Sequence, residues 1–229
     1  MAQHVSAPRS SRRGKVMAIA AGGLVIGLAT AATLAAWTDT EWVFGGNAAG
    51  DGPGVGTSAF EVEQNVTAPF DAAGFVQDEE NPGSPLTFGL DALSLSPGDS
   101  VYAPVALRTV DGSVAGSIDL QSAVAADGIT VTDADGVLFG ALELRVAVNT
   151  TAVACDAAAF TPTSTIADGT LADAEGNAAQ ALNADSGNTQ YYCFELTLPD
   201  APTLPAGTTL DDLQGRTVAP AWEFAAESE

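Results

Sequence analysis

The sequence predicts an all-β fold, an antiparallel β-sandwich. The main observation is that apolar residues recur at every second position in five segments: 60–66, 101–108, 118–124, 142–148 and 192–198. Alternation at this spacing puts one side of each strand in a core and the other side in water. Short turn sequences separate the segments, and helical periodicity is nearly absent. Strands joined by short turns, without alternating helices, favour antiparallel sheets over a parallel α/β arrangement.

The clearest strand is 142–148, in which Leu and Val alternate with more polar residues. Glu143 and Arg145 are expected on its outer face, where they can pair, although an exposed ion pair contributes little stability. Pro104 lies inside the pattern of 101–108. Because proline cannot donate a hydrogen bond to a neighbouring strand, Pro104 predicts an edge strand.

The remaining pattern supports one β domain. The segment 118–124 is expected to place Ile118, Leu120 and Val124 on one face, and only 170–183 has the composition of a short helix. We find no internal repeat and no second domain. Turns are predicted at four places: Ser96-Pro97-Gly98-Asp99, Asp111-Gly112, Asp127-Gly128 and Asp135-Gly136.

Residues 1–35 predict a signal peptide, expected as an N-terminal signal helix. Basic residues precede an uncharged run, 16–36, which ends in small residues. Thr33 and Ala35 stand where a signal peptidase recognises its substrate, so cleavage is expected between Ala35 and Ala36. The chain is then expected to be secreted, extracellular or at the cell surface. An uncleaved membrane anchor is the alternative, because the run is nearly long enough to span a bilayer.

Two further parts are expected after cleavage: an N-terminal segment with a Gly-rich linker, 36–57, and a β-sandwich domain, 58–229. Trp37 and Trp42 lie just after the predicted cut and ahead of the Gly-rich stretch 45–57. A flexible linker of that length reaches on the order of 20 Å. The segment could therefore dock on its own domain or reach a neighbouring copy, and the two tryptophans are candidate assembly residues.

The composition after residue 35 excludes several functions. Three arginines against 29 acidic residues give a formal net charge of −26, and there is no lysine or histidine. The sign is wrong for binding nucleic acid or anionic membranes, so membrane contact is expected only through an uncleaved signal. Without histidine there is no Ser-His-Asp, Cys-His or HExxH site, and without lysine no Schiff base or P-loop. Carboxylate chemistry, such as the acid pair of a glycosidase, is what these exclusions leave, and a carboxylate-based hydrolase is a third hypothesis. With 29 acidic residues a carboxylate pair has almost no specificity as a signal, so we do not expect an enzyme.

The cysteines and one acidic motif are the remaining candidates. Cys155 and Cys193 are predicted to form a disulfide, because two cysteines in an oxidising compartment most simply pair. Asp133 and Asp135, in Asp133-Ala134-Asp135-Gly136, resemble the start of a calcium loop but lack the later ligands and the closing Glu. A plain Asp-Gly turn is the other interpretation. No cofactor is predicted apart from this calcium alternative.

Several motifs together resemble the camelysin/TasA-type exported proteins. Thr33-Leu34-Ala35-Ala36-Trp37-Thr38-Asp39 is similar to the end of their signal peptides, and Leu95-Ser96-Pro97-Gly98-Asp99 to their Leu-x-Pro-Gly-Asp turn. The C-terminal part is similar to an actinobacterial branch, the alternate signal-mediated exported proteins. The matching pieces are Tyr192-Cys193-Phe194, Leu198-Pro199, Leu213-Gln214-Gly215-Arg216 and Trp222-Glu223-Phe224.

The resemblance implies a jelly-roll-like β-sandwich at the cell surface and cleavage by a SipW-type signal peptidase. For the better-understood relatives it also implies assembly into extracellular matrix fibres. For this chain we expect such assembly to use β-strand exchange at a sheet edge. Camelysin itself is classed as a metallopeptidase, but no metal-binding motif of this sequence matches. A surface adhesin or a calcium-dependent binding module is the alternative function.

Overall fold

The computed structural model describes residues 40–229. They belong to two units, the described part of the first being 40–56 and the second 57–229. The second unit holds all the strands and helical turns. In chain order these are β1 (Val62–Asn65), η1 (Ala72–Gly74), η2 (Leu90–Leu93), β2 (Ser100–Thr109), β3 (Gly116–Leu120), β4 (Val124–Ala125), α2 (Val137–Ala141), β5 (Glu143–Asn149), η3 (Ala157–Ala159), β6 (Thr165–Thr170), β7 (Gln180–Leu182), β8 (Gln190–Thr197), η4 (Leu210–Leu213), β9 (Pro220–Ala221) and β10 (Phe224–Ser228).

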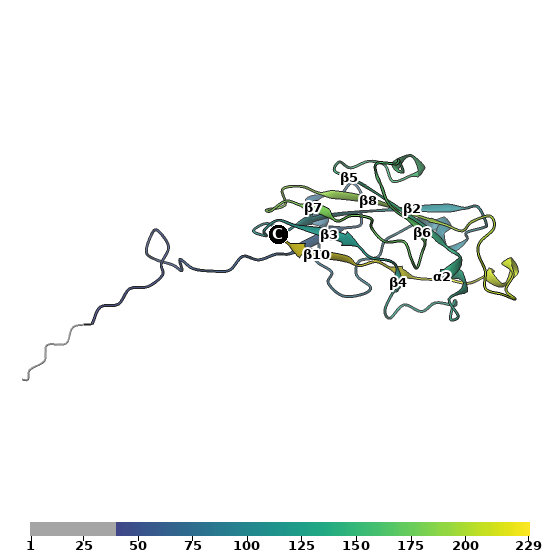
Figure 1. Ribbon diagram of the computed structural model, residues 1–229, viewed down its shortest axis with the longest axis horizontal. Coiled ribbons are helices and arrows are strands. Elements are labelled where there is room, and N and C mark those ends of the chain that lie inside the picture. Colours follow the sequence, from purple (N-terminus) through teal and green to yellow (C-terminus); the bar gives the residue numbers. More distant parts are fainter. Residues whose placement is uncertain (1–39) are drawn as a thin grey trace, which may run out of the picture. The chain divides into compact units, whose positions relative to one another are not determined.

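The predicted all-β class with antiparallel sheets is confirmed. The largest sheet has the strand order β1-β2-β8-β5-β6, and every neighbouring pair is antiparallel (Figure 1). Its central strand is β8, which pairs with β2 on one side and with β5 on the other. A smaller sheet has the order β10-β3-β7, and β4 pairs with β9 alone.

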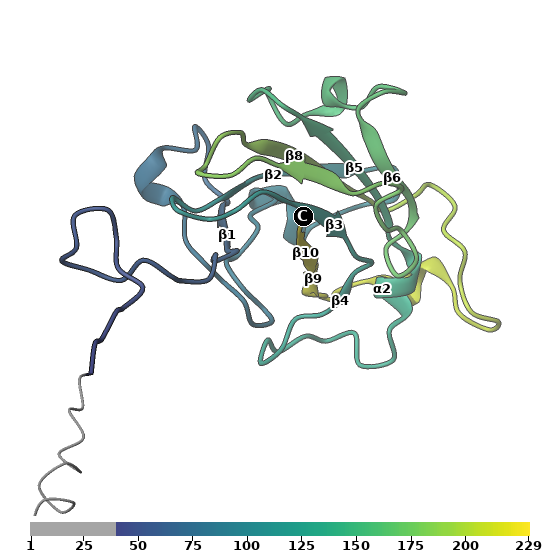
Figure 2. The ribbon, with the colours of Figure 1, turned by 60° about the vertical axis from the view of Figure 1, so that its left-hand side comes forward.

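The core lies between the five-stranded sheet and the three-stranded sheet, where β10 and β3 lie across from β8 (Figure 2). Phe194 of β8 is fully buried, and its ring centroid lies 4.9 Å from that of Trp222 and 6.3 Å from that of Phe224. Tyr192 contacts Phe224 at 4.9 Å. Burying a large apolar side chain contributes about 1.5–3 kcal/mol. The apolar alternation predicted in 192–198 and 142–148 therefore points into the shared core.

The prediction from Pro104 was wrong for the strand as a whole. β2 is an internal strand, with β1 and β8 as neighbours. However, β1 is short, and its last residue, Asn65, pairs with Ala106. At Pro104 the strand therefore has only β8 beside it, where Cys193 is its partner. The absent N–H is tolerated because β1 has already ended.

Two other expectations also fail in detail. Val124 does not continue the face of Ile118 and Leu120; it lies in the separate strand β4 and is 52% exposed. The stretch 170–183 forms no helix. It ends β6, turns, and supplies β7, which pairs with β3. Packing against the small sheet outweighs the weak helix preference of this Ala-rich stretch, which Gly176 interrupts.

The four predicted turns are confirmed. In the first, Asp99 N donates to Ser96 O at 2.9 Å, and the Asp99 carboxylate accepts from Ser96 N at 2.8 Å. Gly98 has a φ of +91°, and a Cβ there would lie 2.7 Å from a carboxylate oxygen of Asp200. The glycines of the other three turns also have positive φ. Only glycine adopts that region without strain, which is why these dipeptides mark the turns.

The signal helix, the cleavage site between Ala35 and Ala36, and Trp37 lie outside the described residues. Over 40–229, no helix has the length and apolar character required to cross a bilayer.

Candidate functional site

Asp133, one of the two calcium candidates, lies in the loop between β4 and α2. Its side chain is only 1% exposed. The carboxylate accepts hydrogen bonds from the backbone N–H groups of Leu138 and Phe139, each at 2.9 Å. Asp133 thus satisfies N–H groups at the start of α2 that have no partner inside the helix.

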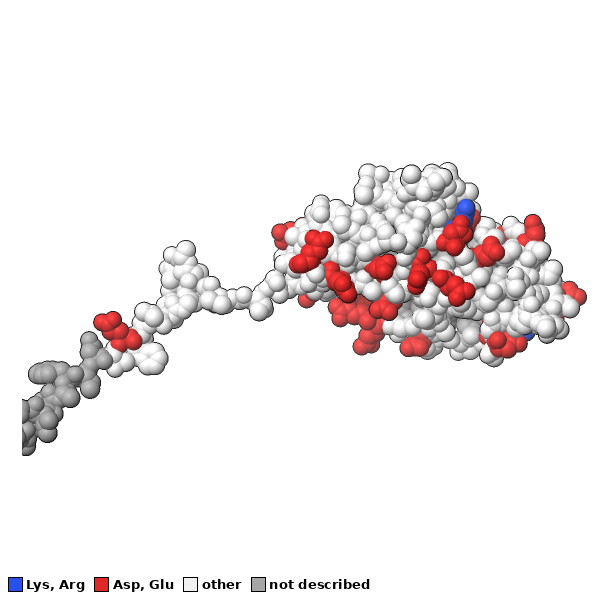
Figure 3. Space-filling model, in the orientation of Figure 1, with Lys and Arg blue, Asp and Glu red and all other residues white. Residues whose placement is uncertain are grey.

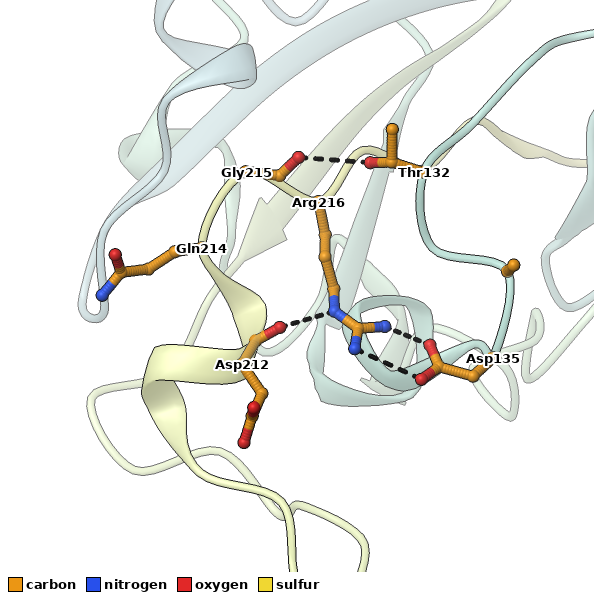
Figure 4. Close-up of a pocket in the computed structure, with 7 residues that line it drawn as sticks. Thr132, Asp135, Asp212, Gln214, Gly215 and Arg216 are labelled. Carbon is orange, nitrogen blue, oxygen red and sulfur yellow. Dashed lines mark hydrogen bonds and ion pairs between the residues drawn. The ribbon is translucent and has the colours of Figure 1, made fainter.

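Arg216 approaches the same carboxylate from the loop after η4. Figure 4 shows its guanidinium against Asp135 and the backbone of Asp212. Its Nη1 donates to Asp133 Oδ1 at 2.8 Å and also to Asp135, and its Nη2 donates to Asp135 Oδ2 at 3.2 Å. Its Nε donates to the carbonyl oxygen of Asp212 at 2.6 Å. We call this set, Arg216 with Asp133, Asp135 and Asp212, the arginine clamp. It joins the loop before α2 to the loop after η4.

Hydrogen bonds stabilise the charged forms of three residues of the clamp, Asp135, Asp212 and Arg216. The pKa of Asp135 is lowered, chiefly by its hydrogen bond from Arg216. The hydrogen bonds to Asp135 and Asp133 raise the pKa of the Arg216 guanidinium. The pKa of Asp212 is lowered by hydrogen bonds from the backbone N–H and the hydroxyl of Thr209. All three shifts favour ionised groups near neutral pH.

The structure therefore brings Asp133 and Asp135 together, but against a guanidinium. An open pocket of about 410 Å³ lies beside them, lined by polar residues that include Gln214. Within residues 40–229, no three His, Cys, Asp or Glu side chains are grouped so that they could hold a metal ion. A positive charge already lies against both candidate carboxylates, so the arrangement acts as a structural link.

The predicted disulfide between Cys155 and Cys193 is present, with a Cα–Cα distance of 5.2 Å. Cys193 lies on β8, on the face turned away from the core, and is nevertheless buried. The bridge ties the loop after β5 to the centre of the largest sheet. A disulfide of this kind is typical of an oxidising environment and weakly indicates a non-cytoplasmic location.

Next to the disulfide, three polar residues form a row across the outer face of the same sheet. Glu195 of β8 is in the middle, with Tyr102 of β2 opposite it on one side and Arg145 of β5 on the other. The Tyr102 hydroxyl donates to Glu195 at 2.7 Å, and Arg145 Nε donates to it at 2.5 Å. Phe160 covers this row, with its ring 4.6 Å from the Arg145 guanidinium. The pairing expected within one strand, Glu143 with Arg145, was wrong because the nearer acid comes from the next strand.

The third arginine of the described chain, Arg108, is held in the same manner. Its Nε lies 2.6 Å from Glu63 on the neighbouring strand β1, and its guanidinium stacks over Phe75 at 3.9 Å. All three arginines of residues 40–229 therefore have an acidic partner.

The first unit contains Trp42, the assembly candidate that the structure describes. Trp42, Val43 and Phe44 are 90%, 97% and 73% exposed, in consecutive positions. Three consecutive exposed apolar side chains are unusual on a protein in water, and they mark this segment for contact with something else.

The Gly-rich stretch after them has a defined turn. Over 45–54, Gly54 N donates to Gly45 O at 3.0 Å, and the side chain of Asn47 accepts from Gly50 N at 2.8 Å. The predicted linker is therefore a closed loop over most of its length, which shortens its reach.

Sequence reasoning missed the arginine clamp and the polar row. Both depend on residues far apart in the chain: Arg216 and Asp133 are 83 positions apart, and Arg145 and Glu195 are 50 apart. The one available signal was the scarcity of arginine, since each of three cations among so many acids must find a partner. The sequence matches no model of a known protein family, and no curated protein is significantly similar to it.

Proposed function

We propose that this chain is an exported structural protein of the cell surface or extracellular matrix. In this proposal it is a fibre or biofilm matrix subunit, released by a SipW-type signal peptidase and assembled by β-strand exchange. The domain follows a jelly-roll-like path, as the resemblance to camelysin/TasA-type proteins implies.

The observation that carries the proposal is the exposed apolar run Trp42-Val43-Phe44. An extended segment of this kind can add to the sheet edge of another copy, where its main chain finds hydrogen bonds and its side chains find cover. Because it lies close to the predicted cut at Ala36, cleavage would free it from the membrane. Export itself would then permit assembly.

Two further observations fit a structural role. The domain has antiparallel sheets, and a disulfide ties a loop to the largest of them, which is typical of proteins in an oxidising environment. The polar groups that line the pocket of the arginine clamp bond to one another or to neighbouring residues. The alternative, a surface adhesin or calcium-dependent binding module, gains no support from Asp133 and Asp135, because Arg216 binds both.

The test uses the mature chain beginning at Ala36. Electron microscopy and native mass measurement should find ordered polymers of the full mature chain. Deleting 36–44, or replacing Trp42, Val43 and Phe44 by serine, should leave a folded monomer that does not polymerise.

The matched control changes exposed residues of the neighbouring loop, with Ala48→Ser, Ala49→Ser and Asp51→Ser. This control should still polymerise. Polymers that survive deletion of 36–44 unchanged would reject strand exchange by this segment. Calcium-dependent binding of a surface ligand by a chain that stays monomeric would favour the alternative.

A further inference from the structure

β10 is an open edge of the small sheet, since it pairs with β3 alone. Gln121 N donates to Glu223 O at 2.9 Å, and Glu229 N donates to Ala115 O at 3.1 Å. These two bonds, one just beyond each end of β3, show that the backbone groups of the odd-numbered residues face β3. Successive residues of a strand point their backbone N–H and C=O groups to opposite sides. The N–H and C=O groups of Phe224, Ala226 and Ser228 therefore point away from β3. None of these six groups has a hydrogen-bond partner within 57–229.

The other edge strands of the two larger sheets do have hydrogen-bond partners outside their sheets. In β1, Gln64 N donates to Val76 O at 2.8 Å. In β6, Ile166 O accepts from Asn177 N at 2.9 Å, and in β7, Ala181 O accepts from the side-chain amide of Asn188 at 3.0 Å. Folded proteins usually protect an edge with proline, lysine, a bulge or a covering loop. β10 has the sequence Phe-Ala-Ala-Glu-Ser, without proline, lysine or a bulge. Its one charged side chain is Glu227, and no covering loop bonds to it within 57–229.

The side chains of β10 give this edge a charge. Phe224 packs into the core against Tyr192, so its strand neighbours at odd positions face outward. Three of these outward residues on and beside β10 are Glu223, Glu227 and Glu229, all exposed. Acidic side chains gather over the part of the surface where β3 and β10 lie (Figure 3). No arginine of residues 40–229 pairs with any of the three glutamates.

We propose that the open edge of β10 binds an extended, basic strand of a different molecule. The strand adds to the sheet beside β10 through the free N–H and C=O groups of Phe224, Ala226 and Ser228. Its basic side chains lie opposite the row of glutamates, and its alternate apolar side chains lie on the side of Phe224. Strand addition of this type takes its affinity from the main chain and its specificity from alternate side chains.

Charge selects this partner over the chain itself. A second copy of β10, paired antiparallel about Ala226, would place Glu223 opposite Glu229, and like charges directly opposite destabilise a sheet. The apolar segment 41–44 carries Glu41 and no basic residue. The two proposals are tested separately, because deleting 36–44 leaves β10 unchanged and Ala226→Pro leaves the segment 41–44 unchanged.

The experiment measures binding of a heptapeptide of alternating lysine and valine to the mature chain by titration calorimetry. Ala226→Pro removes one outward N–H and leaves the bonds to β3 intact, so we expect at least a tenfold loss of affinity. Glu227→Gln with Glu229→Gln should weaken binding several-fold and reduce its dependence on salt. The matched control is Glu143→Gln, an exposed glutamate of the other sheet, which should bind as the wild type does.

Three results would overturn the proposal. If Glu143→Gln weakens binding as much as the Glu227 and Glu229 changes do, the peptide senses only the overall negative charge. If the wild type binds no peptide but self-associates, and Ala226→Pro abolishes the association, the edge belongs to a second copy. A peptide methylated on alternate backbone nitrogens tests the same hydrogen bonds should Ala226→Pro unfold. Equal affinity of methylated and plain peptide would reject strand addition.

Discussion

Replacing Cys155 and Cys193 by serine should destabilise the domain by about 4 kcal/mol. The bridge closes a loop between residues 38 positions apart. In the chain-entropy estimate, a loop of that length restricts the unfolded chain by about this amount. Apart from the bridge, the segment that carries Cys155 is held mainly by two neighbours in sequence. The carbonyl of the buried Ala159 accepts from Ser164 at 2.7 Å, and the Phe160 ring lies 4.6 Å from the Arg145 guanidinium. The covalent bond therefore supplies much of what holds this segment in place.

The assay is urea unfolding followed by tryptophan fluorescence. With a slope of about 2 kcal/mol per M, the midpoint should fall by about 2 M. The melting temperature should fall by about 8–16 °C for a domain of this size. Reducing the wild-type protein should reproduce the effect, and the unreduced, denatured protein should contain no reactive thiol. A loss below about 1 kcal/mol would refute the entropy argument, because the bridged segment would then move independently of the core.

Three further outcomes follow from the packing and the charges. Phe194→Ala should lower the free energy of unfolding, measured in urea, by about 3–5 kcal/mol, because the side chain is fully buried between the sheets. A decrease of less than about 1 kcal/mol would contradict the described core. The pKa values of Asp135 and Asp212 are lowered in the folded protein, so their ionised carboxylates stabilise the fold at pH values above the ordinary pKa of 3.8. This stabilisation is lost as the pH falls through the lowered pKa values. Acid titration of Arg216→Gln should therefore show a smaller loss of stability below pH 4 than wild type, and an unchanged profile would reject the role of the clamp. Burial raises the pKa of Tyr192 above its ordinary 10.0, so stability falls as pH rises beyond 10, and Tyr192→Phe should retain more of it in alkaline melts.

The sequence predicted the strands well where one periodicity dominated. The alternation in 142–148 and 192–198 corresponds to β5 and β8, and the Asp-Gly turns fall where glycine must take positive φ. Cysteine pairing was predictable because only one pair exists. These features depend on neighbours in the chain, so local chemistry was enough to find them.

The arrangement of strands was less accessible. Pro104 suggested an edge, but the length of β1 decides how many neighbours that position has. Glu143 is two residues from Arg145 on the same strand, but the register of β5 places Glu195 of β8 and Asp168 of β6 beside Arg145, and the ion pair forms with Glu195. Val124 and 170–183 were misassigned because pairing partners far along the chain overrode a local pattern. The same limit hid the arginine clamp, whose halves lie in different loops.

The pairing of all three arginines within residues 40–229 has a consequence for resistance to proteases. Proteases of the trypsin class need a free basic side chain on an extended, accessible segment, and residues 36–229 offer three arginines and no lysine. Arg108 and Arg145 lie within internal strands of the largest sheet, and Arg216 is bonded to three aspartates. Cleavage after any of them requires local unfolding first. The folded domain should persist among such enzymes, and proteases that cut after Asp or Glu should degrade it much faster.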